Sequence, residues 1–247
     1  IVFATDDISN WISIGTASQP FTGYFDGDGY AIKGLTKSLF NYNNGTVKNI
    51  ALKNAVVTDS ATIILNNRGI LSNCYSSSEI SFSSKEKMSV GGLVSKNYGT
   101  ISNCFYNGKI NSTTTYAYES YTGGIAGSND GGTISSCYNL AIITTNKSMD
   151  GIAGEINNAT MKNNYYYEFF ALGYHFTQNG GVKATVDQLK KKDFFVGFDF
   201  DSEWQIDETL EYPAPTLKVM KSAFEVIPEN TTEFAGGNGS LSSHYLT

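Results

Sequence analysis

Apolar residues along this chain occur singly or in pairs within short phrases, and Gly, Asn and Ser separate the phrases. One phrase recurs five times, as NGTVKNIAL from Asn44, RGILSNCYS from Arg68, YGTISNCFY from Tyr98, GGTISSCYN from Gly131 and NATMKNNYY from Asn158. Its leading small residues lie 24, 30, 33 and 27 residues apart. A helical repeat would need amphipathic runs of about ten residues or more, which are missing here. Short strands at an elastic period predict a β-solenoid, with surplus residues leaving as loops.

Equivalent positions of successive repeats predict which side chains stack inside the coil, since neighbouring strands lie about 4.8 Å apart. The first predicted ladder is Leu39, Ile63, Leu93, Ile125 and Ile152. The second is Val47, Leu71, Ile101, Ile134 and Met161. The third is Leu35, Ile50, Cys74, Cys104, Cys137 and Asn164, where Leu35 enters by matching IKGL at 32–35 to VKNI at 47–50.

The second and third ladders are three residues apart within a repeat, which is the wrong parity for one straight strand. A bend must therefore lie between them. We assign it to Asn49, Asn73, Asn103, Ser136 and Asn163, because Asn tolerates left-handed backbone and bonds to its own backbone at turns.

These patterns predict an all-β fold, a right-handed parallel β-helix with a small C-terminal cap. We expect an N-terminal cap or incomplete rung over 1–19, about six rungs over 20–183, a capping segment over 184–218, and an extended tail or following module over 219–247. TVDQLKKKDFF at 185–195 predicts one short helix with Thr185 as N-cap. With Trp204 and Tyr212, this segment is expected to close the C-terminal end of the core.

The composition of the chain limits the classes of partner that it is expected to bind. The net charge of −6 argues against nucleic acid or an anionic membrane. No apolar run approaches the roughly 18 residues of a membrane span, so no insertion is expected. The three cysteines suit neither a disulfide scaffold nor a zinc knuckle, and their shared ladder predicts free buried thiols.

Catalytic chemistry is poorly represented. The two histidines, His175 and His244, are far apart, and neither HExxH nor GxSxG occurs. No catalytic residue, metal site or cofactor is predicted. FDGDG at 25–29 makes Asp26 and Asp28 a weak calcium candidate, but a structural corner is favoured because no longer run of oxygen ligands follows.

An aromatic row is the main candidate for ligand binding. Tyr75, Phe105, Tyr138 and Tyr165 follow the cysteine ladder by one residue, so alternation should point them outward, where they could bind sugar rings or a partner. Packing of the row under the loops at 81–90 and 111–122 or against the cap is favoured, because aromatic residues make up 13% of the chain and must be placed in a narrow coil. Those loops, with the one at 143–150, should lie on one side and form any adhesive surface.

The repeated phrases resemble the GLUG-repeat family of bacterial surface proteins, which also occurs in non-catalytic regions of IgA-peptidase-like polypeptides. The resemblance rests on WISIG at 11–15, PFTGYFDGDGYAIKGL at 20–35, GGLVSKNYGTISNCF at 91–105, GGIAGSNDGGTISSCY at 123–138 and VGFDFDSEWQIDETLEYPAPTLK at 196–218. It covers nearly the whole chain. SLFNYNN and TIILNNR depart from it by lacking the Gly-Gly lead of later rungs.

The stretch FAGGNGSLSSHYLT at 234–247 resembles the opening of a fresh module. Either the chain is a fragment of a tandem array, or the tail adds a strand to the next chain and builds head-to-tail filaments. Phe234, Tyr245 and Leu246 are the candidates for self-association.

The expected function is therefore a non-enzymatic, extracellular module of a bacterial cell surface, acting as adhesin, stalk or assembly unit. Expected partners are the chain itself, or a host or cell-surface protein or glycan. One alternative is a carbohydrate-active β-helix enzyme or glycan-binding module. The enzyme would need an acidic and basic cluster on one sheet face, which the repeats do not show. Another is an accessory region of a surface peptidase.

Overall fold

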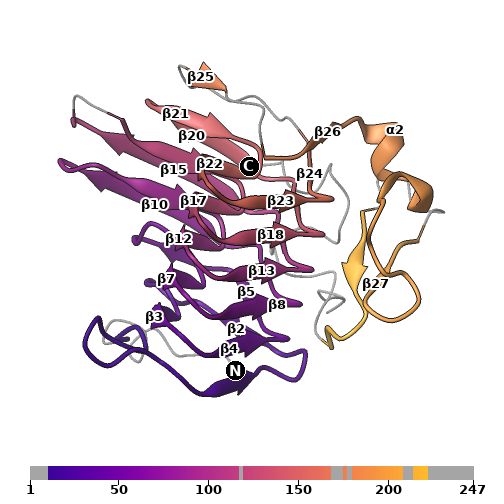
Figure 1. Cartoon of the computed structure of the whole chain (residues 1–247), viewed down its shortest axis with the longest axis horizontal. Coiled ribbons are helices and arrows are strands. Elements are labelled where there is room, and N and C mark those ends of the chain that lie inside the picture. Colours follow the sequence, from indigo (N-terminus) through magenta and orange to yellow (C-terminus); the bar gives the residue numbers. More distant parts are fainter. Residues whose placement is uncertain (1–10, 117–118, 168–174, 177–179, 208–213, 222–247) are drawn as a thin grey trace, which may run out of the picture.

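In the computed structural model, the chain winds into a coil of parallel strands whose rungs stack from the N-terminal end upward (Figure 1). The structure describes residues 11–116, 119–167, 175–176, 180–207 and 214–221. A complete rung supplies one strand in turn to each of five parallel sheets, which we name B, C, A, D and E in chain order. The fold is thus all-β and β-helix-like, as the repeats predict.

Sheets B, C and A form the regular part of the coil. Sheet B contains β3 (Phe40–Asn43), β7 (Ile64–Asn67), β12 (Val94–Asn97), β17 (Ala126–Asp130) and β22 (Ala153–Asn157). Sheet C contains β1 (Tyr24–Asp26), β4 (Thr46–Lys48), β8 (Ile70–Ser72), β13 (Thr100–Ser102), β18 (Thr133–Ser135) and β23 (Thr160–Lys162). Sheet A contains β2 (Ala31–Lys33), β5 (Ala51–Lys53), β9 (Tyr75–Ser76), β14 (Phe105–Tyr106), β19 (Tyr138–Asn139), β24 (Tyr165–Tyr167) and β26 (Val182–Ala184).

Sheets D and E are built largely from segments that the sequence predicts as loops. Sheet D contains β6 (Val56–Val57), β10 (Glu79–Ser84), β15 (Lys109–Thr114) and β20 (Ile142–Thr145). Sheet E contains β11 (Ser89–Gly91), β16 (Tyr121–Gly123), β21 (Ser148–Asp150) and β25 (His175–Phe176). These segments do extend on one side of the coil, but as paired strands, because equivalent loops of stacked rungs can continue the ladder of hydrogen bonds.

The predicted ladders hold, with one correction. Val47, Leu71, Ile101 and Ile134 are fully buried and pair in register. The match of IKGL to VKNI is wrong, because β1 pairs Phe25 with Val47 and β2 pairs Ile32 with Leu52. FDGD is therefore the first-rung counterpart of VKNI. Leu35 is buried but lies beyond that register.

The bend between the second and third ladders is confirmed at every predicted position. All five residues have left-handed backbone, with φ of +56° at Asn49, +52° at Asn73, +50° at Asn103, +51° at Ser136 and +56° at Asn163. Non-glycine residues rarely adopt this region, and Asn does so most readily. This conformation turns each rung from sheet C into sheet A.

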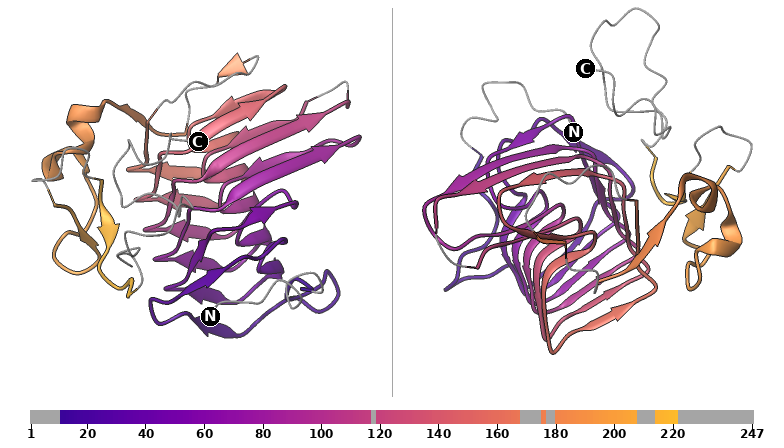
Figure 2. Two further views of the ribbon diagram at one scale, coloured as in Figure 1. Left: turned by 180° about the vertical axis from the view of Figure 1, so that it is seen from behind. Right: turned by 90° about the horizontal axis from the view of Figure 1, so that it is seen from above.

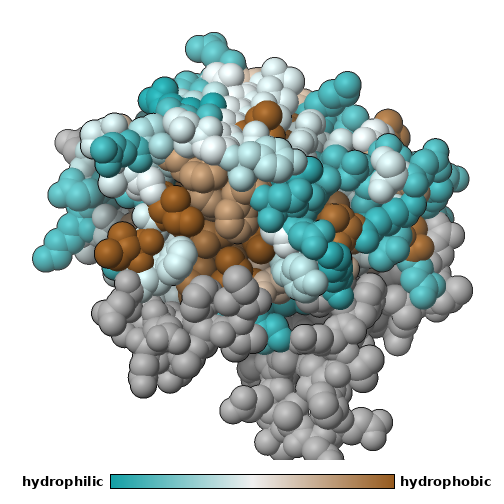
Figure 3. Space-filling view, turned by 90° about the horizontal axis from the view of Figure 1, so that it is seen from below, coloured by the Kyte–Doolittle hydropathy of each residue, from teal (hydrophilic) through white to brown (hydrophobic). Residues whose placement is uncertain are grey.

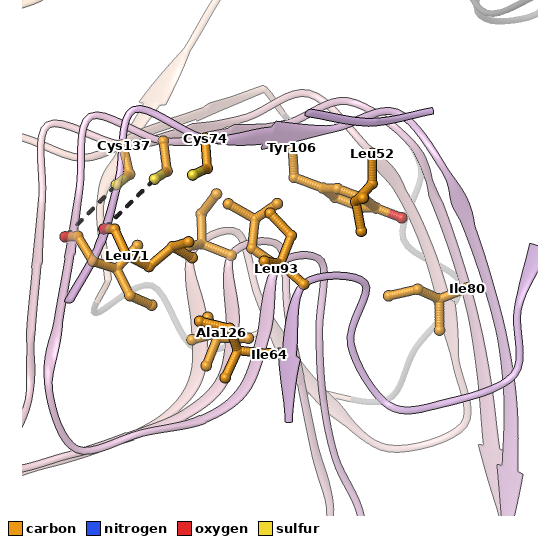
Figure 4. Packing of buried hydrophobic residues seen from close by; sticks show 14 of the residues in the cluster. Leu52, Ile64, Leu71, Cys74, Ile80, Leu93, Tyr106, Ala126 and Cys137 are labelled. Atoms are coloured by element: carbon orange, nitrogen blue, oxygen red, sulfur yellow. Dashed lines mark hydrogen bonds between the residues drawn. The ribbon is translucent and has the colours of Figure 1, made fainter. Parts of the chain in front are cut away.

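The three cysteines are free and lie inside the coil, as predicted. Figure 4 shows Cys74 and Cys137 pointing into the interior beside Leu71 and Leu93. The Cys104 thiol donates a hydrogen bond to the Ser102 carbonyl at 3.1 Å. Burial raises the pKa of Cys104 well above its usual value, which keeps this thiol protonated and unreactive.

A ladder of buried asparagines runs beside the apolar ones. Asn43 Nδ2 donates to Asn67 Oδ1, Asn67 Nδ2 to Asn97 Oδ1, and Asn97 Nδ2 to Asn129 Oδ1, each at 2.8 Å. All four side chains are fully buried. Each amide is both donor and acceptor, so a stack can satisfy itself without water. The same residues bond to the turns that follow, as Asn43 does with Gly45.

The two rungs without a Gly-Gly lead pair normally with their neighbours. Ser38 and Thr62 stand where later rungs have the second glycine, and both hydroxyls are buried. Ser38 Oγ donates to the Ala61 carbonyl at 2.6 Å, and Thr62 Oγ1 donates to the Gly92 carbonyl. In the fourth rung, a Cβ on Gly92 would lie 2.3 Å from the ring of Tyr106. Glycine is thus needed there to make room for a large interior side chain.

The segment over 180–221, where described, is a clasp that lies along the flank of the coil (Figure 2). It contains α2 (Val186–Leu189), η1 (Lys192–Phe194) and an antiparallel pair of β27 (Trp204–Gln205) with β28 (Thr216–Leu217). Thr185 is the N-cap of α2 and forms a capping box with Gln188, as the sequence predicts for the N-cap. The helix is shorter than 185–195, because it stops at Leu189.

The clasp does not close the C-terminal end of the core, and that expectation is wrong for its described residues. Its aromatic side chains instead form a second apolar core against sheet A. It also runs back to the first rung, where the Lys221 amide donates to the Gly29 carbonyl at 2.8 Å. The Lys221 ammonium pairs with the Asp28 carboxylate and lies 4.7 Å from the ring centroid of Tyr30.

The first-rung end presents apolar side chains in the middle of the face drawn in Figure 3, with more hydrophilic ones above them and to the right. Trp11, Ile14, Phe21 and Phe25 are partly buried against the main core at the start of the coil. The Trp11 indole donates to the Ser38 carbonyl at 3.1 Å. These contacts fix the first described residues to the rung that follows them.

Candidate functional site

The aromatic row points out of the coil but is not exposed. Tyr75, Phe105, Tyr138 and Tyr165 are 5, 5, 1 and 4% exposed. Phe105 and Tyr138 contact Trp204, with ring centroids 6.2 and 5.7 Å apart, and Tyr165 contacts Phe194 at 5.0 Å. The row is therefore not an open stripe for sugars, and the favoured interpretation, packing against the capping segment, is confirmed. The outward direction itself is correct.

The FDGDG stretch is a corner. Asp28 and Gly29 have φ of +49° and +75°, and Asp26 Oδ1 accepts from the Asp28 amide at 2.9 Å. That backbone bond, with the amide of Asn49 and then Lys48, lowers the pKa of Asp26. Lys48 and Lys221 already pair with Asp26 and Asp28, so both carboxylates have cationic partners of the protein's own.

The other candidates lie elsewhere. Phe234, Tyr245 and Leu246 lie outside the described residues, as do Tyr212 and His244. Within the described ranges, no group of three or more His, Cys, Asp and Glu side chains could hold a metal ion. No helix in the described part of the chain is long and apolar enough to cross a bilayer.

A groove on the outer face of sheet B is the candidate functional site. It has a volume of about 230 Å³ and spans the fourth, fifth and sixth rungs, counted from the rung of β1. Lys96, Ser128 and Glu155 form its floor, because β12, β17 and β22 place them in register on successive rungs. Their neighbours Asn97 and Asn129 alternate to the inside and belong to the buried asparagine ladder. The same strands thus fix both faces.

Two further elements complete the groove. Tyr98, Asp130 and Asn157 lie just beyond the floor residues along sheet B. The opposite side is formed by Lys87 and Ser89, where the chain enters β11. The predicted adhesive loop at 81–90 therefore contributes to this site, although most of the lining comes from sheet B.

Charges in the groove are mixed and only partly paired. Lys87 Nζ lies 4.0 Å from Glu155 Oε1 and 5.3 Å from the ring centroid of Tyr121. Burial, followed by nearby Glu119 and Glu155, raises the pKa of Tyr121, so its hydroxyl stays protonated. Lys96 and Asp130 are both exposed, and neither has an ion pair or side-chain hydrogen bond within the described ranges.

This groove is not predicted from the sequence. The repeats do not show an acidic and basic cluster on one sheet face, yet the structure brings together Lys87, Lys96, Asp130 and Glu155. Its members differ from rung to rung, so a search for repeated residues passes over them. The available signal was the register, which aligns Lys96, Ser128 and Glu155 at one outward position.

Comparison with known proteins supports the architecture alone. No protein-family model and no curated protein matches the chain. The structure is similar to a crystal structure named as a candidate immunoglobulin A1 protease from Bacteroides ovatus, with a TM-score of 0.59 and 19% sequence identity. The match covers 85% of this chain and 81% of the other. At this identity the likeness shows a shared fold.

Proposed function

We propose that the chain is a non-enzymatic module of a bacterial surface protein of the GLUG-repeat type, and that it acts as an adhesin by displaying its groove. A right-handed sense of the coil, expected for crossovers between parallel strands, is part of this proposal. One observation carries it: the clasp returns the chain to the first rung, where Lys221 bonds to Gly29.

Because the chain returns to the first rung, the upper rungs do not lie between residues 11 and 221 in space. Residues 11–15 and 221 both lie at the first rung, since Ile14 pairs with Phe40 and Lys221 with Gly29. The groove lies on the fourth to sixth rungs, away from that end. A spacer would carry the chain from one end of the coil to the other, so the geometry favours display over a stalk in series.

Attachment of the chain in two orientations tests this proposal. Ile12 is 83% exposed at the first rung, and Thr160 is exposed on the last. Because the native cysteines are buried, Ile12→Cys and Thr160→Cys can each be coupled selectively to beads. We expect beads coupled through position 12 to be retained under flow on mucin or epithelial cells. Coupling through position 160 should place the groove against the bead and reduce retention. No retention in either orientation, or equal retention, would contradict display.

A second candidate, an accessory region of a surface peptidase, is favoured by the structural neighbour, whose name refers to an immunoglobulin A1 protease. In that case the full chain should leave immunoglobulin A intact but bind it. Binding of immunoglobulin A by surface plasmon resonance, with no cleavage products on a gel, is the expected result. Cleavage by the chain alone would contradict a non-enzymatic role.

A further inference from the structure

We propose that the groove over sheet B binds a neutral saccharide, held between the Lys96 ammonium and the Asp130 carboxylate beside the ring of Tyr98. This assigns a ligand class to the groove and rests on the proposed function only for its biological setting.

The proposal rests on two charged side chains of the groove, Lys96 and Asp130. Lys96 and Asp130 border the same groove on adjacent rungs, both exposed and without a polar partner within the described ranges. An ammonium offers only donors and a carboxylate only acceptors. A sugar hydroxyl can accept from the first and donate to the second, so vicinal hydroxyls satisfy both groups. Bonds to charged groups are also stronger than neutral ones.

The balance of charge selects a neutral ligand. The groove holds two ammonium groups, at Lys87 and Lys96, and two carboxylates, at Asp130 and Glu155. A polyanion would meet the carboxylates and a polycation would meet the lysines, and a misplaced like charge is costly. The chain's net charge of −6 also disfavours anionic glycans.

The groove disfavours an extended peptide. Peptides that add to sheets use the free backbone groups of an edge strand. The strands that carry Lys96 and Asp130, β12 and β17, are paired on both sides, so neither has a free edge, and of the three floor strands only β22, which carries Glu155, is an end strand of sheet B. Recognition must come from side chains, which suits a polyhydroxylated ring.

Tyr98 supplies an aromatic edge to this site. Its side chain is 36% exposed, and the guanidinium of Arg68 lies 4.8 Å from the ring centroid. The cation fixes the orientation of the ring. A volume of about 230 Å³ suits a short saccharide segment, being somewhat below the range of drug-sized pockets.

The test uses the full chain and defined oligosaccharides in isothermal titration calorimetry. Neutral cello-, malto- and N-acetylchito-oligosaccharides are compared with anionic heparin fragments and cationic chitosan oligomers. We expect binding of at least one neutral series. Lys96→Ala and Asp130→Ala should each weaken it about tenfold or more, because each removes a bond to a charged group. Tyr98→Ala should weaken it and Tyr98→Phe should preserve it.

Lys109→Ala, which removes an exposed lysine on sheet D, is the matched control and should leave affinity unchanged. Thermal melting of each variant checks that the coil remains folded. Binding of charged glycans alone, no binding of any neutral series at millimolar concentration, or affinity unaffected by Lys96→Ala and Asp130→Ala would overturn the proposal. None of these results bears on the bead orientation test, so the two proposals fail separately.

Discussion

The rings of Phe105 and Tyr138 stack face to face, with centroids 4.9 Å apart and planes only 3° from parallel. Tyr75 extends the stack on the other side of Phe105 at 4.5 Å. The spacing of the rings follows the spacing of the strands that carry them. A second core thus forms outside the coil, and the clasp completes it.

Removing the central ring of the clasp should destabilise the protein strongly. Trp204 is fully buried, contacts Phe105, Tyr138 and Phe198, and donates its indole N–H to Asn103 Oδ1 at 3.4 Å. Trp204→Ala should lower the free energy of unfolding by about 3–5 kcal/mol, measured by urea denaturation. Val196→Ala, at a clasp position 65% exposed, should change it by less than about 0.5 kcal/mol. Equal effects would show that the clasp is not seated on sheet A.

The asparagine ladder should tolerate interruption poorly. Asn67→Ala removes the donor to Asn97 Oδ1 and the acceptor of Asn43 Nδ2 inside the coil. Leaving buried polar atoms unpaired should cost about 2 kcal/mol or more in urea denaturation. The adjacent Asn66 points outward and makes one long bond of 3.4 Å to the Asn41 carbonyl. Asn66→Ala is therefore the control, and a loss as large as that of Asn67→Ala would refute the ladder's contribution.

A charge placed in the cysteine ladder should be tolerated least. Cys104→Asp buries a carboxylate between Cys74 and Cys137 and should cost about 4 kcal/mol or more at pH 7, whereas Cys104→Ala should cost less. Burial raises the folded-state pKa of the introduced carboxyl. The loss of stability caused by its ionisation therefore applies above the unfolded-state pKa of about 3.9 and becomes smaller as the pH falls towards that value. Thermal melting across pH measures both effects. Melting of Cys104→Asp like wild type at pH 7 would disprove the assigned register.

The corner at Asp26 should contribute to the loss of stability in acid. The pKa of Asp26 is lowered in the folded state, first by the hydrogen bond from the Asp28 amide. The stabilisation that Asp26 contributes is therefore present above its unfolded-state pKa and is lost as the pH falls through its folded-state pKa. Asp26→Asn should make the decline of melting temperature below about pH 4 less steep than in wild type. Glu86→Gln, at an exposed turn, should leave the profile unchanged. An unaltered profile for Asp26→Asn would rule out this linkage.

The parts of the fold that repeat could be predicted, and the parts that do not repeat could not. Asparagine occurs at four of the five bends, as at Asn103, and cysteine occurs at the inward position of three successive rungs, as at Cys104, so both signals add over the repeats. Ile32 and Phe25 each precede a charged residue, as Val47 precedes Lys48, and the structure shows that Phe25 is the one in register with Val47. One occurrence was too little to choose between them.

The clasp and the groove depend on residues that occur once. Trp204 meets Asn103 across 101 positions of sequence, and no periodicity announces that contact. Lys96, Ser128 and Glu155 occupy the same outward position on successive rungs. Because the residue type differs on each rung, an alignment of the repeats shows this position only as variable. The aromatic row shows the same limit, because alternation gives its direction but not what covers it.

The return of the chain to the first rung also decides how the module bears load. Tension applied between residues 11 and 221 acts on the bond from Lys221 to Gly29 and the ion pair with Asp28. The upper rungs lie outside that path and carry no force until these contacts break. A pull on the polypeptide would therefore reach the clasp before it could begin to unwind the coil.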